Sequence, residues 1–352
     1  MLLPSTIAIA LVVAPQVVQV EAVLEAQIGS STGPREEVFG RVVDLAADDE
    51  RNVYVLDDRA GEVRVFSPAG EYMRTLGRSG SGPGELNRPS HIDVRGGVVT
   101  VLNPGGRSSS FTLTGELVAS ETLPFGSLSA ARVDDRTHAV FVSGGITRGD
   151  PVPIESLVLV GPASTDTILT VPSNDILFRG PTASSLLRTS LCRLANFVVG
   201  EDGTLWVASG TDGMLTEWRL ADGVSEPARS AELAPLGVPL PDSTRSRLLA
   251  SVPRQLSPEA GDFTLPPILS SMCGLERSTD DAMWVRLADV DGRQRWVAVE
   301  LATLRPTLEL TAPEAVAMSA FAGIRLMASR SMTLELRASW SIVSSRMGRR
   351  AG

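Results

Sequence analysis

Residues 38–77 read VFGRVVDLAADDERNVYVLDDRAGEVRVFSPAGEYMRTLG. Four short apolar runs, VVDLAA, NVYVL, EVRVF and EYMRTL, are separated by turn signals. The turns carry Asp48-Asp49, Asp57-Asp58 with Gly61, and Pro68-Ala69-Gly70. Strands of this length joined by tight turns predict an antiparallel meander.

The same order of strands and turns returns in residues 91–123, HIDVRGGVVTVLNPGGRSSSFTLTGELVASETL. Phe66 matches Phe111, and Asp57 matches Asn103, at an offset of about 45 residues. Four strands per unit at such a period are typical of a β-propeller blade. Weaker copies cover residues 129–171, 196–233 and 272–310, and residues 315–343 supply three further strands.

These units predict an all-β fold, a six-bladed β-propeller of four-stranded antiparallel blades. The last unit lacks a strand, and the N-terminal segment near residues 18–28 is spare, so we expect that strand to close the ring. An aromatic residue precedes valine in the second strand of several units, and we expect these rings to pack between sheets. We assign residues 15–345 to one propeller and residues 346–352 to a tail.

The glycine-rich stretch GSGPGELNRPS, residues 80–90, lies between the first two units. A phosphate-binding Walker loop needs GK[ST] followed by a helix, and a dinucleotide fingerprint also needs a helix after its glycines. Pro89 opposes helix formation here. The stretch is therefore interpreted as a connector between blades.

Residues 29–120 resemble the NHL-repeat type of six-bladed β-propeller found in bacteria. The resemblance rests on YVLDD followed by EVRVF, the Pro-Ala-Gly turn, and GSGPGEL before the proline that opens the next blade. It implies a ring-shaped binding scaffold, often without catalysis. Some proteins of this type are lyases or lactonases with a central metal held by His and acidic residues.

Arginine supplies all 32 basic residues, and the net charge is −9. The absence of lysine excludes a Schiff-base lysine, a lysine general base and a P-loop lysine. An acidic chain does not favour nucleic acid or an anionic membrane surface as its main partner. A small ligand or a protein partner is expected instead, and a monomer is expected.

The apolar run Ile7–Ala14 is too short to span a bilayer and is typical of a signal-peptide core, although no basic residue precedes it. We expect residues 1–14 to be a leader and the protein to be periplasmic or extracellular. A cytoplasmic protein with an apolar first strand is the alternative. Cys192 and Cys273 would form one disulfide bond in an exported protein, and two separate thiols remain the other interpretation.

One face of the ring is expected to collect the fourth-to-first connections and the second-to-third turns, and we call it the loop-rich face. It would carry two insertions, residues 173–190 and 235–271. The second insertion predicts a helix over residues 243–252, capped by Asp242 or Ser243 and stopped by Pro253. Its stripe of Leu248, Leu249 and Val252 is expected to cover the mouth of the ring as a plug or a lid.

The candidate ligand-binding residues lie at this face or near the channel: His91, Asp93, Arg59, Arg78, Arg88 and Arg107. The arginines are either solvated rim charges or a patch for an anionic ligand or acidic partner. His138 is placed on the opposite face. Two histidines cannot make a three-histidine zinc site, but oxygen ligands from Asp44, Asp48, Asp93 and Asn196 allow a calcium site. The acidic pairs fit turn chemistry better.

The sequence thus favours a non-catalytic, exported propeller scaffold that binds a ligand or protein at the loop-rich face, with no cofactor apart from a possible calcium ion. The alternative is a metal-dependent propeller hydrolase or lyase that acts at the channel mouth. Fold alone does not choose between them.

Overall fold

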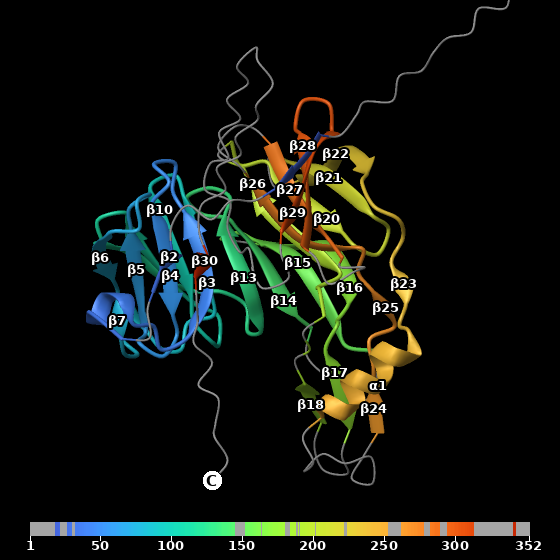
Figure 1. The fold of residues 1–352 in the computed structure, drawn as a ribbon, viewed down its shortest axis with the longest axis horizontal. Helices are drawn as coiled ribbons and strands as arrows, with labels where there is room; N and C mark the ends of the chain where they lie inside the picture. The colour runs from blue at the N-terminus through green and yellow to red at the C-terminus, as the bar shows by residue number, and fades with distance from the viewer. Residues whose placement is uncertain are drawn as a thin grey trace, which may run out of the picture.

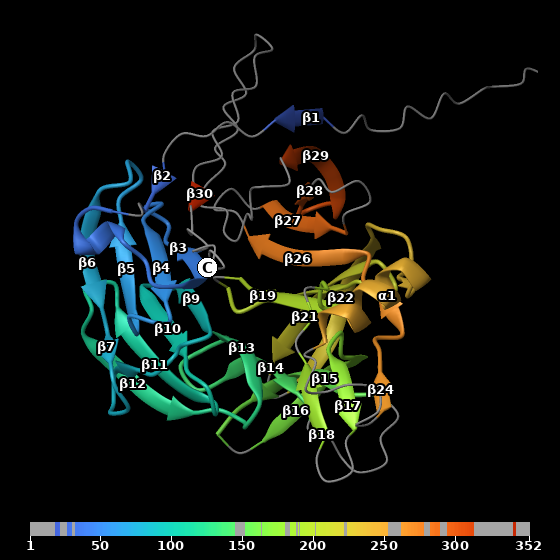
Figure 2. The same ribbon diagram turned by 60° about the horizontal axis from the view of Figure 1, so that its bottom comes forward.

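The structure is a computed structural model, and it describes residues 18–21, 27–29, 32–144, 152–162, 164–179, 184–187, 189, 191–200, 202–221, 224–252, 262–277, 282–288, 294–312 and 341–342. Strands dominate these residues, and their sheets stand around a common axis as the blades of a six-bladed β-propeller (Figure 1 and Figure 2). The predicted fold class is confirmed. The proposed leader, residues 1–14, and the tail, residues 346–352, lie outside the described residues.

Five four-stranded antiparallel blades are described in full order from first to fourth strand. Blade one consists of β3 (Val42–Ala47), β4 (Val53–Asp57), β5 (Glu62–Phe66) and β6 (Tyr72–Leu76). Blade two consists of β9 (His91–Arg95), β10 (Val98–Leu102), β11 (Arg107–Thr112) and β12 (Leu117–Thr122). Blade three consists of β13 (Ser127–Arg132), β14 (His138–Ser143), β15 (Ile154–Val160) and β16 (Thr165–Pro172). Blade four consists of β19 (Ala195–Val199), β20 (Leu205–Ser209), β21 (Met214–Ala221) and β22 (Val224–Glu232). Blade five consists of β26 (Met272–Arg277), β27 (Ala282–Leu287), β28 (Gln294–Glu300) and β29 (Arg305–Ala312).

Burial changes along each blade in the way that the sequence pattern requires. Every residue of β4 and β5 is buried, because the middle of a blade is covered on both faces by its neighbours. The outer strands β6 and β12 are largely exposed and carry mixed polar sequences. The core is therefore distributed between the blades rather than gathered in one centre.

The aromatic residues of the second strands pack between neighbouring sheets, as predicted. Tyr54 lies in a cluster shared by blades one and two, Phe141 in one shared by blades three and four, and Trp206 in one shared by blades four and five. All three are almost fully buried. Large rings at these positions fill the space between adjacent blades, where each contributes a large apolar area.

The glycine-rich connector joins blade one to blade two, as predicted. Its ends, β7 (Arg78–Ser79) and β8 (Glu85–Leu86), pair in parallel, and Leu86 is fully buried between the two blades. The carboxylate of Glu85 accepts a hydrogen bond of 2.8 Å from the backbone N–H of Gly82 and pairs with Arg78 at 2.9 Å. A backbone N–H of the loop thus binds the carboxylate of Glu85 from the same loop. The next element is strand β9 of blade two and not a helix.

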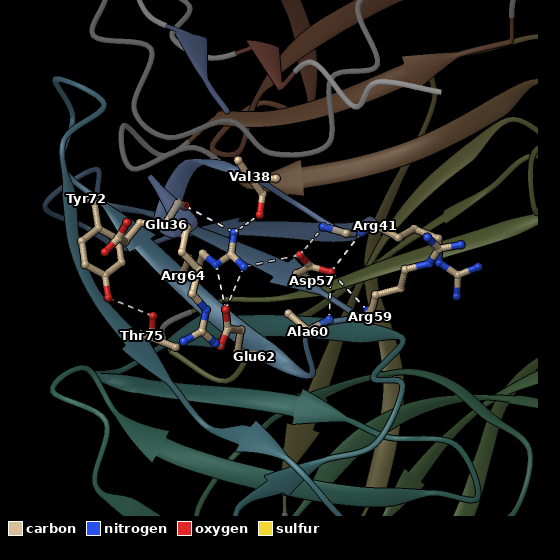
Figure 3. Close-up of polar contacts among 12 residues, drawn as sticks. Glu36, Val38, Arg41, Asp57, Arg59, Ala60, Glu62, Arg64, Tyr72 and Thr75 are labelled. Carbon is tan, nitrogen blue, oxygen red and sulfur yellow. Dashed lines mark hydrogen bonds and ion pairs between the residues drawn. The ribbon is translucent and has the colours of Figure 1, made fainter. Parts of the chain in front are cut away.

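A buried polar network fixes the start of blade one (Figure 3). Asp57 is fully buried and accepts hydrogen bonds from four backbone N–H groups, those of Gly40, Arg41, Arg59 and Ala60, at 2.7–3.2 Å. Arg64 lies between Asp57 and Glu62 and donates a hydrogen bond of 2.8 Å to the carbonyl of Val38. The network ties the incoming chain to the end of β4.

Blade two repeats this arrangement with a neutral side chain. Asn103, which matches Asp57 in the repeat, accepts a hydrogen bond of 2.8 Å from the backbone N–H of Asn87. In both blades a polar residue at the end of the second strand therefore anchors the connection that leads into the blade. This anchoring sets where the loops of the loop-rich face stand.

The N-terminal segment divides between two positions at the seam of the ring. β2 (Gln27–Ile28) pairs in parallel with β30 (Ser341–Ile342), between blades five and one (Figure 2). β1 (Val18–Glu21) instead adds a parallel fifth strand to the outer edge of blade five, beside β29. The expectation that residues 18–28 form one strand of the last unit is wrong for β1. Residues 313–340 lie outside the described residues.

The two insertions meet one another. β17 (Ile176–Arg179) pairs with β18 (Ser184–Leu187) and also with β24 (Asp262–Thr264) from the second insertion. β23 (Val238–Pro239) pairs with β25 (Ile268–Leu269), and α1 (Asp242–Ser251) lies beside these strands at one end of the molecule (Figure 1).

Helix α1 differs from its prediction in its cap and in its packing. Its N-cap residue is Pro241, and no side chain caps it; proline fixes the extended backbone that precedes a helix. Leu248 is buried in a cluster with Ile176 and Leu240, whereas Leu249 is exposed. Of the predicted stripe, only Leu248 and Val252 therefore pack among residues of the insertions. The helix lies to one side of the ring's centre and does not cover its mouth (Figure 2).

Candidate functional site

The blades surround a cavity of about 750 Å³ that lies on the axis of the propeller. Its walls come from the first strands of all five described blades, β3, β9, β13, β19 and β26. Figure 2 shows these strands facing a common centre. The first strand is the edge of each blade's sheet, and its unpaired edge faces the channel, so residues of all five strands line the cavity. We call this space the central cavity.

His91 and Asp44 join blade two to blade one at the cavity wall. Nδ1 of His91 lies 2.7 Å from Oδ2 of Asp44, and the backbone N–H of Ile92 donates to the same oxygen at 3.0 Å. Burial acts to lower the pKa of His91 and is the largest single influence. The hydrogen bond and charge of Asp44, with the charge of Asp93, outweigh it and raise that pKa above its ordinary value.

Asp93 and Glu276 add two more carboxyl groups to the central cavity. Burial raises the pKa of Asp93; the charge of Asp44 adds to this, while Arg95 and His91 oppose it. Burial likewise raises the pKa of Glu276 to about 8, with the charges of Asp44 and Asp93 adding to it and Arg286 opposing. At neutral pH the carboxyl of Glu276 is therefore mostly protonated and able to donate a hydrogen bond.

A disulfide bond lies in the same wall. Cys192 and Cys273 both line the central cavity and are bonded to one another, with their Cα atoms 4.8 Å apart. The bond links the start of blade four to the first strand of blade five and so spans 81 residues of chain. Of the two interpretations that the sequence left open, the structure adopts the bonded one.

Two of the residues considered for calcium, Asp48 and Asp44, are held by other contacts. Asp48 accepts hydrogen bonds from Asn52 and from the hydroxyl of Tyr54 at 2.8–3.0 Å, which is turn chemistry. Asp44 is engaged by His91. Among the residues that the structure describes, no group of three or more His, Cys, Asp or Glu side chains is arranged to hold a metal ion. A calcium site stays a sequence-based prediction.

A second hollow, of about 560 Å³, lies at the loop-rich face between blades one and two, and we call it the arginine groove. Arg88 and Arg107 line it together with Arg41, which sequence reasoning missed. Arg59 and Arg78 do not belong to its lining as described. Arg78 is 80% exposed and pairs with Glu85. The four predicted arginines therefore separate into two that share a hollow and two that do not.

His138 is placed away from both hollows. It begins β14, is buried, and lies 3.4 Å from the carboxylate of Glu121. Burial lowers its pKa. Neither the central cavity nor the arginine groove is lined by His138 in the part of the chain that the structure describes.

Sequence reasoning missed Glu276 and also four arginines that line the central cavity, Arg95, Arg193, Arg277 and Arg286. Glu276 lies in the first strand of a weakly repeating unit, MCGLER, where two charged residues after the apolar run of an inner strand were the available signal. A search for candidate membrane spans found no helix of sufficient length and hydropathy among the described residues.

Comparisons with known proteins support the fold. Residues 36–156 match the family model DUF5128, described as a 6-bladed beta-propeller; the match covers blades one and two and runs into β15. No curated protein matches the chain. The NHL type of repeat, which the sequence resembles, stays a prediction.

Two solved structures illustrate what the chain is similar to. A Bacteroides fragilis protein described as exported aligns at 12% identity with a TM-score of 0.47, covering 83% of this chain and 80% of its own. A protein of unknown function from Bacteroides caccae aligns at 8% identity with a TM-score of 0.40, covering 77% of this chain and 86% of its own.

Proposed function

We propose that this protein is an exported, non-catalytic binding scaffold that holds a small polar ligand in the central cavity, with the loop-rich face as the entrance. The observation that carries the proposal is the convergence of His91, Asp93 and Glu276 from two different blades on one hollow. A volume of about 750 Å³ lies in the range of small-molecule sites. An NHL-type ring, which the sequence resembles, implies the same kind of role.

The chemistry of the cavity indicates the kind of ligand. Asp93 accepts hydrogen bonds when ionised, and Glu276 donates one when protonated and accepts them when ionised. Both carry a raised pKa, so a ligand that supplies N–H or O–H groups would recover part of the free energy lost to burial. Amines, amino acids, sugars and other polyols have such groups.

Export is supported by the disulfide bond. A bond between Cys192 and Cys273 persists in an oxidising compartment and is reduced in the cytosol. The apolar run in residues 7–14 is the sequence feature that agrees with it. Both features support our proposal that the protein acts in the periplasm or outside the cell.

A thermal-shift screen tests the proposal. Purified, oxidised protein is screened against small amines, amino acids, sugars and polyols, and each hit is repeated with Asp93→Asn and with the exposed control Asp135→Asn. We expect at least one compound to raise the melting temperature of wild type and of the control but not of Asp93→Asn. A screen without hits, or hits that Asp93→Asn leaves unchanged, would contradict a ligand site in the central cavity.

Metal analysis of the same preparation separates the alternative. Stoichiometric calcium or zinc that is lost on chelation, together with a hydrolase or lyase activity, would favour the metal-dependent enzyme. A metal-free protein that still binds its hit from the screen supports the scaffold.

A further inference from the structure

The arginine groove carries a net positive charge on an acidic protein. It is formed by the start of β3, the β4–β5 turn, the connector into blade two, and the β10–β11 turn. Asp58 is the carboxylate in its described lining, and that carboxylate is already engaged by the guanidinium of Arg41, whose Nε lies 2.8 Å from Oδ1. The charges of Arg88 and Arg107 therefore have no carboxylate in the described lining to balance them.

Arg107 is held in place by neutral groups. Its guanidinium donates hydrogen bonds to the carbonyl oxygens of Ser81 and Glu85, the second at 2.9 Å. Its Nε is buried and has no hydrogen-bond partner among the described residues. The side chain is thus fixed by the connector while its charge remains available, which is the arrangement that favours binding of an anion over repacking of a flexible arginine.

Arg88 is presented by a constrained backbone. Its φ is 52°, an uncommon value for a residue with a side chain, and buried Pro89 follows it. The preceding residue, Asn87, is tied by its backbone N–H to Asn103. Within the described residues Arg88 forms no hydrogen bond or ion pair, and it is exposed at the groove. The fold holds this residue in a strained conformation beside Arg107.

We propose that the arginine groove is an anion subsite, in which Arg88 and Arg107 bind the carboxylate or phosphoryl group of a small ligand. Guanidinium groups recognise both kinds of oxyanion through paired N–H donors. A hollow of about 560 Å³ suits a small molecule. Val43 and Ser90 line both this groove and the central cavity, so one ligand can extend from the groove into the channel. In that form the inference rests on the proposed function.

The test uses full-length, oxidised protein and two probes, inorganic phosphate and succinate, each titrated calorimetrically in a chloride buffer of low ionic strength. Arg88→Gln is the main variant because the side chain makes no described contact that its loss would break. Arg107→Gln is the second variant, and Arg136→Gln, an exposed arginine in the β13–β14 turn, is the control. The two probes tell a phosphoryl subsite from a carboxylate subsite.

We expect saturable one-to-one binding of at least one probe, weakened roughly 10-fold or more by Arg88→Gln and by Arg107→Gln and unchanged by Arg136→Gln. Absence of saturable binding by both probes, or equal affinity in Arg88→Gln, would overturn the proposal. So would binding by an oligoglutamate peptide alone, since that result would indicate an acidic protein partner.

A cavity variant separates the two proposals. Asp93→Asn alters the central cavity and leaves the groove residues in place. Probe binding that survives Asp93→Asn and is lost in Arg88→Gln supports the groove even where the screen for a cavity ligand fails. A cavity ligand that binds without any anion binding at the groove leaves the proposed function standing and removes the anion subsite.

Discussion

Asp44 of blade one accepts a hydrogen bond from His91 of blade two, with 2.7 Å between Oδ2 and Nδ1. The same oxygen accepts the backbone N–H of Ile92, so a single carboxylate fixes both the ring and the strand that carries it. The pair joins two blades at the wall of the central cavity and sets the protonation of a histidine that faces it.

Replacing Asp44 by asparagine is expected to lower the pKa of His91. Burial alone would lower that pKa. The hydrogen bond and the charge of Asp44 are the main effects that oppose burial, and the pKa of His91 is raised on balance. Because the pKa of His91 is higher in the folded state, its protonation stabilises the fold. This contribution is complete below about pH 6.5 and is lost as the pH rises through the raised pKa. The variant should lose this dependence. NMR titration of 13C-labelled histidine measures it, with His138 as internal control; an unchanged His91 titration would show that the pair does not form.

Removing the disulfide bond is expected to destabilise the protein. In the chain-entropy model a bond that spans 81 residues stabilises the fold by about 4.5 kcal/mol. The double variant Cys192→Ser, Cys273→Ser should therefore unfold at lower denaturant concentration, and reduced wild type should match it. Chemical denaturation of all three samples gives the comparison. Equal stability of oxidised and reduced wild type would argue against the bond.

Glu276→Gln is expected to flatten the dependence of stability on pH. The folded pKa of Glu276 is about 8, above its ordinary value, so the folded state keeps a proton that the unfolded chain has lost. Stability conferred by this group is complete below about pH 4.5 and declines by at most about 1.4 kcal/mol per pH unit up to about pH 8. Thermal melts between pH 5 and pH 8 test this, with the exposed Glu71→Gln as control. Parallel curves for wild type and Glu276→Gln would count against it.

Asp57→Ala is expected to lower the free energy of unfolding by about 3–5 kcal/mol. The substitution removes the carboxylate of Asp57, which pairs with the buried guanidinium of Arg64. It also removes the acceptor of four backbone N–H groups. Asp135→Ala, which removes an exposed partner of Arg132 at 3.5 Å, should cost less than about 1 kcal/mol. Similar losses in the two variants, measured by urea denaturation, would contradict the role assigned to Asp57.

The blades could be predicted because each is a local meander whose turns and apolar runs recur along the chain. The pairing of β17 with β24 could not, since it joins residues from two separate insertions and leaves no periodic signal. For the same reason the sequence does not reveal the blade to which β1 belongs: its four residues, VQVE, alternate apolar and polar as many edge strands do, and its pairing with β29 depends on the assembled ring.

The candidate site was predictable where the repeat was strong. His91, Asp93 and Asp44 lie in the first strands of the two clearest units, and the structure places all three at the central cavity. Glu276 lies in a fainter copy of the repeat. The sequence indicates that its segment is a first strand, but it does not show that Asp44 and Asp93 of other blades lie near it. The ion pair of Arg41 with Asp58, which leaves Arg88 and Arg107 unbalanced, depends on side-chain packing that spacing alone does not reveal.

An experimental structure of the protein soaked with the compound that gives the largest thermal shift tests the central claim most directly. The account predicts ligand density in the central cavity, within hydrogen-bond distance of Asp93 or Glu276 and reached from the loop-rich face. Density at another surface, with the central cavity holding only solvent, would contradict it.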